Sequence, residues 1–178
     1  MATTPTTTTD VAKPYEFKPH EKAAVEAYMA KQAEKPPRPE VRVKEKGGRV
    51  SIAHDHPELA VGHVMLARAM GSADSAFHHE LLLQVANASG SGPKPDEGAL
   101  NFTLAVIDGI GPRDQTEAML AAQMAAVHMA TMTFARRLQH VENIPQQDSA
   151  ERAFNKLTRT FAVQMETLKR YRTGGSKK

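Results

Sequence analysis

Hydrophobic side chains recur at alternating steps of four and three residues along two segments in the last third of the chain. Residues 114–142 carry this pattern at Leu120, Met124, Val127, Thr131, Phe134, Leu138 and Val141. Residues 148–172 carry it at Ala150, Phe154, Leu157, Phe161, Gln164, Leu168 and Tyr171. A heptad seam of this kind is typical of helices that pack along each other. The pattern therefore predicts two long helices with matching hydrophobic faces.

The short connection between these helices predicts an antiparallel hairpin over residues 114–172. Asn143 to Gln147 leave room only for a reversal of the chain. If the numbers of facing residues sum to 291 or 292, each seam residue of the first helix faces one of the second. Phe134, for example, faces Leu157. A buried amide without a partner costs about 1–3 kcal/mol. We therefore expect Gln164 to form a hydrogen bond across the seam or to a third element.

Three shorter apolar segments before the hairpin predict a small helical cluster. They span residues 57–70, 73–88 and 96–110, and the glycines and prolines after each segment end it. The Asp-x-x-Glu pairs at 55/58, 114/117 and 148/151 are typical of helix starts, because the Asp side chain can cap free backbone amides. Pro57 is expected at the first helical position, and Asp96 is expected to cap the third helix. The predicted fold class is all-α.

The N-terminal part predicts smaller elements. Residues 19–34 form an amphipathic pattern that ends before Pro36, and this predicts a short helix. Residues 41–52 alternate apolar and charged side chains around Gly47-Gly48, which favours a short β-ribbon. The expected organisation is a disordered tail (1–18), a helix and ribbon arm (19–52), a helical domain (53–173) and a disordered basic tail (174–178). The ribbon is either an ordinary solvated loop or a mobile arm that orders on a partner.

A second apolar stripe runs beside the seam on the first long helix. A lone hairpin would leave this stripe in water, and its alanines are small enough to let another helix approach closely. Either the three-helix cluster packs there or a second protomer does. The predicted partner-binding residues are Met119, Ala122, Ala126, Met129 and Thr133.

Basic charge is concentrated in the last third of the chain. Residues 1–112 hold 12 Lys/Arg against 14 Asp/Glu, whereas residues 113–178 hold 11 against 6. Such asymmetry is typical either of a solvated basic face or of affinity for nucleic acid. A salt-sensitive contact with the phosphate backbone is the expected form of binding, since no helix-turn-helix pattern is present. The candidate nucleic-acid-binding residues are Arg42, Lys44, Lys46, Arg49, Arg136, Arg137, Lys156, Arg159, Lys169, Arg170 and Arg172.

Histidine is the one side chain that suggests metal chemistry. His54, His56 and His63 lie close together in sequence, and His78-His79-Glu80 follows. Two imidazoles and a carboxylate could bind a divalent metal. However, Asp55 is expected to cap a helix, and the His-Glu-x-x-His spacing is missing. Neither a nucleophile elbow nor a phosphate-binding loop occurs. We therefore expect no catalytic residues, no metal and no cofactor.

Composition places the protein among soluble intracellular proteins. The chain has no cysteine, which excludes disulfides and thiolate metal sites and favours the cytoplasm. Residues 1–10 lack the features of a signal or transit peptide. No uninterrupted apolar run approaches the roughly 20 residues of a membrane span. No membrane contact and no small-molecule substrate are expected.

The C-terminal third also resembles a known group of proteins. The segments 118–137, 144–150, 154–159 and 168–175 carry the likeness, beginning with Ala118-Met-Leu-Ala-Ala-Gln-Met. They resemble a family of uncharacterised helical proteins from rhizobia and other proteobacteria, some of them similar to prophage or other mobile-element genes. The resemblance implies a helical fold and a role in packaging or structural assembly, and it implies no activity and no site.

Three functions are consistent with these patterns. The first is a non-enzymatic scaffold or adaptor that self-associates or binds a partner protein through the Ala/Met stripe. The second is a DNA-binding protein of small-terminase-like or nucleoid-associated type. The third is a metal-dependent enzyme that uses His54, His56 and His63.

Overall fold

The computed structural model describes residues 15–90, 92 and 94–174. The predicted disordered tails, 1–18 and 174–178, therefore lie mostly outside the described residues. The chain divides into two compact units, Met1–Pro36 and Pro37–Lys178. Each unit is described by itself.

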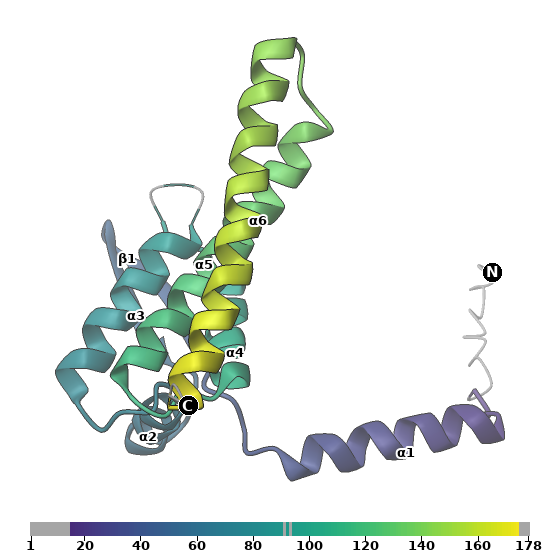
Figure 1. Ribbon diagram of the computed structural model, residues 1–178. Coiled ribbons are helices and arrows are strands. Elements are labelled where there is room, and N and C mark those ends of the chain that lie inside the picture. Colours follow the sequence, from purple (N-terminus) through teal and green to yellow (C-terminus); the bar gives the residue numbers. More distant parts are fainter. Residues whose placement is uncertain (1–14, 91, 93, 175–178) are drawn as a thin grey trace, which may run out of the picture. The chain divides into compact units, whose positions relative to one another are not determined.

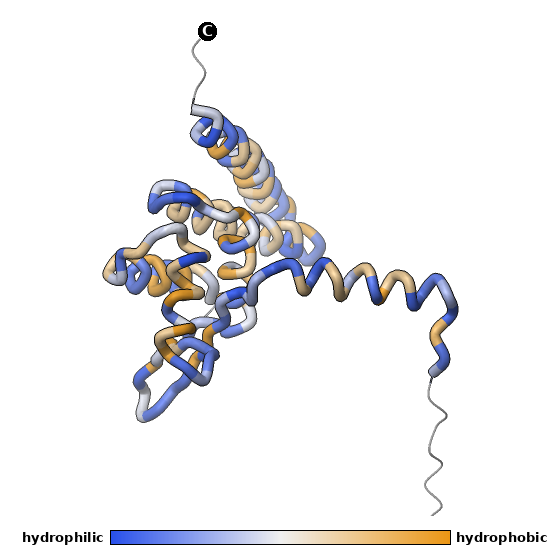
Figure 2. Tube along the Cα trace, turned by 90° about the horizontal axis from the view of Figure 1, so that it is seen from below, coloured by the Kyte–Doolittle hydropathy of each residue, from blue (hydrophilic) through white to orange (hydrophobic). Residues whose placement is uncertain are grey.

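The first unit contains one helix, α1 (Pro19–Glu34), with the bounds that the sequence predicts. Its first turn is held by the Glu21 carboxylate, which accepts a hydrogen bond from the Lys18 backbone N–H at 2.8 Å. Hydrophobic and hydrophilic residues are interspersed along this helix (Figure 2). No residue of α1 is buried in the described structure. Its stability therefore comes from local hydrogen bonds, which are marginal for a helix of this length.

The second unit confirms the predicted all-α fold with a short ribbon and a long C-terminal hairpin (Figure 1). A helical cluster surrounds a hydrophobic core of Leu66, Met70, Leu100, Leu104 and Ile107. The last two helices pack along each other and project beyond α3 and α4. The elements are β1 (Val41–Lys46), β2 (Arg49–His54), α2 (Leu59–Ala69), α3 (Ser75–Ser89), α4 (Glu97–Ile110), α5 (Gln115–Leu138) and α6 (Ile144–Arg172).

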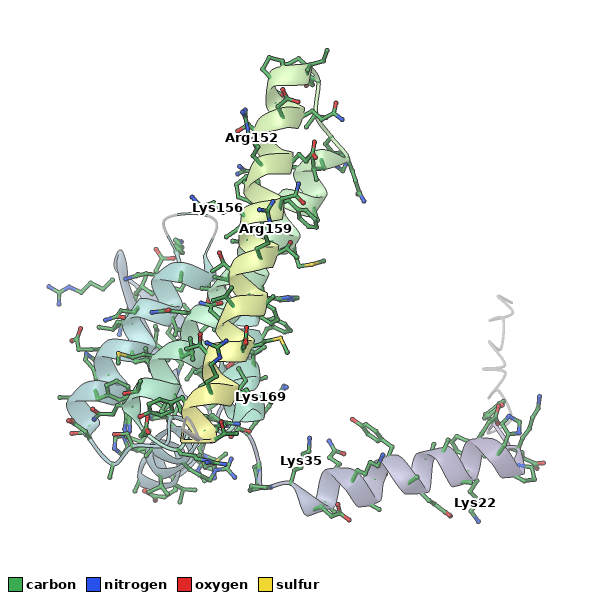
Figure 3. All side chains as sticks on the ribbon, in the orientation of Figure 1. Lys22, Lys35, Arg152, Lys156, Arg159 and Lys169 are labelled. Carbon is green, nitrogen blue, oxygen red and sulfur yellow. The ribbon has the colours of Figure 1, made fainter. Side chains whose placement is uncertain are left out.

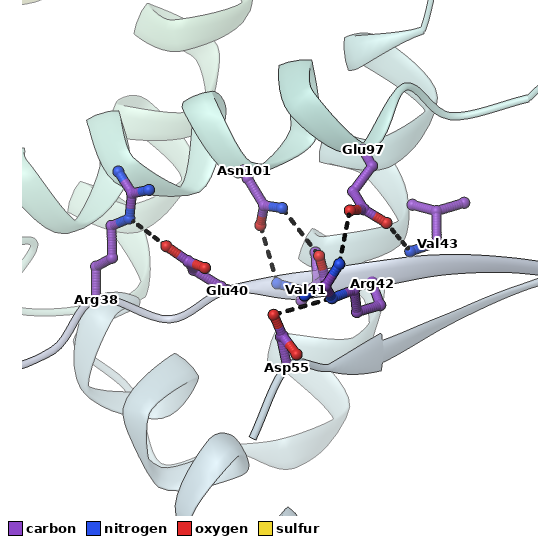
Figure 4. Close-up of polar contacts among 8 residues, drawn as sticks. All are labelled: Arg38, Glu40, Val41, Arg42, Val43, Asp55, Glu97 and Asn101. Atoms are coloured by element: carbon purple, nitrogen blue, oxygen red, sulfur yellow. Dashed lines mark hydrogen bonds and ion pairs between the residues drawn. The ribbon is translucent and has the colours of Figure 1, made fainter. Parts of the chain in front are cut away.

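The antiparallel ribbon turns at Gly47 and Gly48, and both glycines have positive φ. It is docked on α4 (Figure 4). The Asn101 amide accepts from the Val41 N–H and donates to the Val41 carbonyl, both at 2.9 Å. Glu97 accepts from the Val43 N–H at 2.8 Å. The ribbon is therefore neither a solvated loop nor part of a separate arm with α1, and the predicted boundary at residue 52 is wrong.

Two of the predicted helix caps are confirmed. Asp96 accepts from the Ala99 N–H at the start of α4, and Asp114 accepts from the Glu117 N–H at 2.9 Å at the start of α5. Gly111 ends α4 in the left-handed conformation, as expected for a glycine at this position.

The cap predicted at Asp55 is wrong, because that residue extends the ribbon. Its N–H donates to the Glu40 carbonyl at 2.8 Å, and its carboxylate accepts from Arg42 Nε at 2.9 Å. Helix α2 consequently begins at Leu59, two residues after Pro57, and Glu58 caps it.

The cap predicted at Asp148 is also wrong. Helix α6 begins at Ile144, where the Asn143 side chain accepts from the Gln146 N–H at 3.0 Å. Pro145 lies in the first turn, the one part of a helix interior that tolerates proline. Since α5 ends at Leu138, the reversal occupies residues 139–143, about four residues earlier than predicted.

Burial along α6 confirms the predicted seam. Ala150, Phe154, Leu157, Phe161, Gln164 and Leu168 are all shielded at least in part, and only Tyr171 at the open end is exposed. Val141 and Ala150, an expected layer, line one hollow near the tip.

The hydrogen bond predicted for Gln164 is absent from the described structure. Gln164 Oε1 is buried and accepts no hydrogen bond from the described residues. Thr131, the polar residue expected in the adjacent layer, donates its hydroxyl to the Val127 carbonyl of its own helix at 2.7 Å. The two polar residues therefore do not satisfy each other.

Helix α5 has one further property. Among the described helices it alone has the length and apolar composition that could cross a membrane. Ala118, Ala121 and Ala125 of this helix are fully buried within the protein, and the core helix of a soluble protein passes the same test. The cytoplasmic location remains a prediction.

Candidate interaction surfaces

The predicted partner-binding stripe lies at the edge of the helical cluster. Met119 is 46% exposed, Ala122 is buried, and Ala126 and Met129 are half-buried. These four residues line a groove of about 210 Å³ between α3 and α5, whereas Thr133 does not. The opposite wall is supplied by α3, with Leu81, Gln84, Val85, Ala88 and Ser89.

The neighbouring face of α5 explains why the groove exists. Ala118, Ala121 and Ala125 are buried, and α5 packs against both α3 and α4. Alanine allows such close approach because its side chain is a single methyl group. The cluster therefore covers the alanine face of α5 and leaves the adjacent Met/Ala stripe as one wall of a groove. The α3 wall could not be predicted from the stripe alone, since it depends on how the helices pack.

The groove has no charged wall residue. Its two buried hydroxyls already donate within their own helices, Ser89 to the Val85 carbonyl at 2.6 Å and Thr103 to the Ala99 carbonyl at 2.8 Å. The glutamines Gln84 and Gln123, which also line the groove, are exposed. A surface of this kind fits an uncharged apolar helix face and has little to offer a charged ligand.

The predicted nucleic-acid-binding residues do not form one surface. Arg42 pairs with Asp55 and Glu97 and so holds the ribbon, while Arg170 pairs with Glu166 at 2.6 Å. Arg172 is partly buried and pairs with Glu117 at 2.9 Å. The remaining candidates are exposed and occur in two places: Lys44, Lys46 and Arg49 on the ribbon, and Arg136, Arg137, Lys156, Arg159 and Lys169 on the hairpin.

Sequence reasoning missed one exposed cation of this group, Arg152. It precedes Lys156 and Arg159 at a spacing of four and then three residues, so all three share one face of α6. Figure 3 labels them along the projecting part of the hairpin, with Lys169 nearer its base. The helical spacing was the signal that could have identified Arg152.

The histidines form a row of rings that joins β2, α2 and α3. The ring centroids of His54 and His63 are 6.1 Å apart, and those of His63 and His78 are 5.6 Å apart. His78 is only 1% exposed, and its Nε2 lies 2.6 Å from the Ser72 carbonyl, to which it donates. Burial and the neighbouring His63 lower the pKa of His54.

These rings are not joined by carboxylates in a metal-binding arrangement. Within the described residues, no group of three His, Asp or Glu side chains is placed to hold a metal ion. His56, the third histidine of the predicted group, lies apart and contacts the backbone of Glu58 through Nδ1. The rings of His54, His63 and His78 pack between β2, α2 and α3.

Comparison with known proteins gives no further assignment. No family model, curated protein or solved structure matches the chain. The resemblance to helical proteins of proteobacteria therefore remains a prediction.

Proposed function

We propose that the protein is a non-enzymatic helical scaffold that self-associates through the Met/Ala stripe of α5. The observation that carries this proposal is the uncharged groove between α3 and α5. On its α5 wall, Met119 is about half exposed and lies beside small alanine side chains. Exposed methionine next to alanine is typical of adaptable helix contact surfaces. The occupant that the groove fits is an apolar helix face.

The order of residues along the stripe favours a second copy of this chain as that occupant. The sequence of side chains is Met119, Ala122, Ala126 and Met129, which reads the same in both directions. In a pair of antiparallel α5 helices whose facing residue numbers sum to 248, methionine meets methionine and alanine meets alanine. A two-fold symmetric interface requires such self-complementarity. Ala122 is buried in the groove, so the exposed part of this contact would come from Met119, Ala126 and Met129.

Sedimentation velocity on matched variants tests this proposal. Met129→Arg places a charge in the groove, whereas Met132→Arg makes the same change one turn away at a residue that is 56% exposed and outside the groove. We expect a wild-type dimer at micromolar concentrations, a monomer for Met129→Arg and a dimer for Met132→Arg. Circular dichroism checks that both variants keep their helices. A monomeric wild-type protein at 100 μM would reject self-association.

A disulfide measurement tests the antiparallel register independently. The chain has no cysteine, so Gln123→Cys introduces a single exposed thiol close to the expected two-fold axis. Mild oxidation should give a covalent dimer in high yield. Met132→Cys, about two turns from the axis, should give little. Equal yields from both variants would contradict the proposed pairing.

A further inference from the structure

Two stretches of the hairpin helices carry cations and no carboxylates. On α5 and the following loop no Asp or Glu occurs between Glu117 and Glu142, and on α6 none occurs between Glu151 and Glu166. These stretches hold Arg136, Arg137, Arg152, Lys156 and Arg159, which we call the basic shaft. The exposed surfaces of soluble proteins usually mix positive and negative side chains. Within these two stretches no carboxylate interrupts the positive charges, whereas Asp148 and Glu151 lie just before Arg152 on α6.

The ion pairs of the hairpin lie elsewhere. Arg170 pairs with Glu166 and Arg172 pairs with Glu117, both toward the base of the hairpin. In the part of the chain that the structure describes, none of the five shaft cations is within 4.0 Å of a carboxylate. All five side chains are exposed. Their charge is therefore available to a partner outside the chain.

The α6 cations form an ordered row. Arg152, Lys156 and Arg159 line a shallow groove together with Asn155 and Thr160. At a rise of 1.5 Å per residue this row extends about 10 Å along the helix, which matches the axial rise of about three nucleotides in one DNA strand. Thr160 donates its hydroxyl to the Lys156 carbonyl at 2.9 Å. Asn155 donates to the Glu151 carboxylate at 3.5 Å, and Arg152 Nε donates to the Asp148 carbonyl at 3.1 Å. The free donors of the row are therefore Lys156, Arg159 and the terminal nitrogens of Arg152.

The other side chains of the shaft favour a double-stranded partner. Proteins that bind single strands stack bases on exposed aromatic rings. The aromatic residues of the shaft are Phe134, Phe154 and Phe161, which belong to the seam and are partly buried. The groove contains one exposed aliphatic residue, Val163. A helix that lies in a membrane surface needs a much larger apolar face, so this row fits phosphate groups better than a lipid surface.

We infer that the basic shaft binds the phosphate backbone of duplex DNA, with Arg152, Lys156 and Arg159 as the principal contacts. Arg136 and Arg137 of α5 add charge from the neighbouring helix. The guanidinium of Arg137 lies 5.0 Å from the centre of the Phe134 ring, which orients it. The expected contacts are with phosphate groups, which position a protein on a duplex without reading the base sequence. This function is separate from self-association through the groove.

Fluorescence anisotropy with a labelled duplex of 25 base pairs tests the inference on the full-length protein. The shaft variant carries Arg152→Gln, Lys156→Gln and Arg159→Gln. The matched control carries Lys22→Gln, Lys31→Gln and Lys35→Gln in the first unit, so both proteins lose three positive charges (Figure 3 labels Lys22 and Lys35). Glutamine keeps the helix propensity of the replaced residues.

We expect micromolar binding by wild type at 50 mM salt, a loss of at least tenfold for the shaft variant, and less than threefold for the control. The slope of log affinity against log salt should fall by about 2 to 3 in the shaft variant, because each phosphate contact contributes about 0.9. Undetectable wild-type binding, equal losses in both variants, or tighter binding to a single strand of the same length would overturn the inference. So would binding to vesicles with 30% phosphatidylserine in the absence of DNA binding.

Discussion

Arg172 Nη2 lies 2.9 Å from Glu117 Oε2, so the last turn of α6 is joined to the first turn of α5. The same guanidinium donates to the carbonyls of Ile110 and Gly111 at the end of α4. Glu117 is only 1% exposed. One side chain therefore connects three helices at the base of the hairpin, and Arg172 is used within the fold instead of being presented to nucleic acid.

Loss of this connection should destabilise the protein. Arg172→Met leaves the Glu117 carboxylate buried without its cation, and we expect unfolding free energy to fall by about 2 kcal/mol. Urea denaturation at pH 7 measures this change. The control is Arg170→Met, since Arg170 forms an exposed pair with Glu166 and should cost less than about 0.5 kcal/mol. Equal effects of the two substitutions would contradict the structural role of Arg172.

The same ion pair predicts a loss of stability in acid. The hydrogen bond from Arg172 holds the pKa of the Glu117 carboxyl below its ordinary value of 4.5, and the Arg113 N–H acts in the same direction against the effect of burial. The unfolded chain therefore binds this proton first as the pH falls. The contribution of the ionised Glu117 carboxylate to the free energy of unfolding is complete above pH 4.5. It is lost as the pH drops through the pKa of this group in the folded state. Urea midpoints at pH 6 and pH 3.5 should differ less in Arg172→Met than in wild type.

The histidine row predicts a second effect at higher pH. Burial, and secondly the nearby His63, lower the pKa of His54 from its ordinary value of 6.5. The contribution of neutral His54 to the free energy of unfolding is therefore complete above pH 6.5. It decreases as the pH falls below this value, until His54 is protonated in the folded protein as well. NMR titration should find the midpoint of His54 below the ordinary value of 6.5. His63→Gln should move the His54 titration upward, and an unchanged titration would reject the coupling between the two rings.

The unsatisfied amide in the seam predicts a stabilising substitution. Gln164 Oε1 is buried without a hydrogen bond from the described residues. Gln164→Leu removes this cost and keeps a similar volume, so we expect a gain of about 1 kcal/mol. Thermal unfolding measures the gain, and Gln147→Leu at an exposed position of the same helix serves as the control. A decrease in stability for Gln164→Leu would mean that the amide has a partner in solution.

Much of the fold could be predicted because local periodicity determines it. The seam of the hairpin, the ribbon around Gly47-Gly48 and the bounds of α1 follow from side-chain spacing. One error occurred where a distant residue competes for a side chain, and another came from the placement of a helix start. Asp55 resembled a helix cap but pairs with Arg42, which precedes it by 13 positions. Asp148 resembled a cap because Pro145 was assigned to the loop.

The candidate surfaces were predictable only in part for the same reason. The Met/Ala stripe follows from spacing on one helix, but the groove also needs Leu81 and Val85 of α3, and sequence does not place that helix beside α5. The sequence shows where the basic residues lie along the chain. Whether each is free or paired depends on contacts across the fold, and so Arg172 could not be distinguished from Lys156.

Buried side chains of the hairpin gather at its base. On α5 the buried residues are 117, 118, 121, 122, 124 and 125, and near the tip only Ala150 is buried among the described residues. Local opening costs least where few apolar contacts must be broken. Amide hydrogens near Leu138 and Ile144 should therefore exchange with solvent faster than those near Ala121, so that the far end of the hairpin can fray and re-form while its root stays folded.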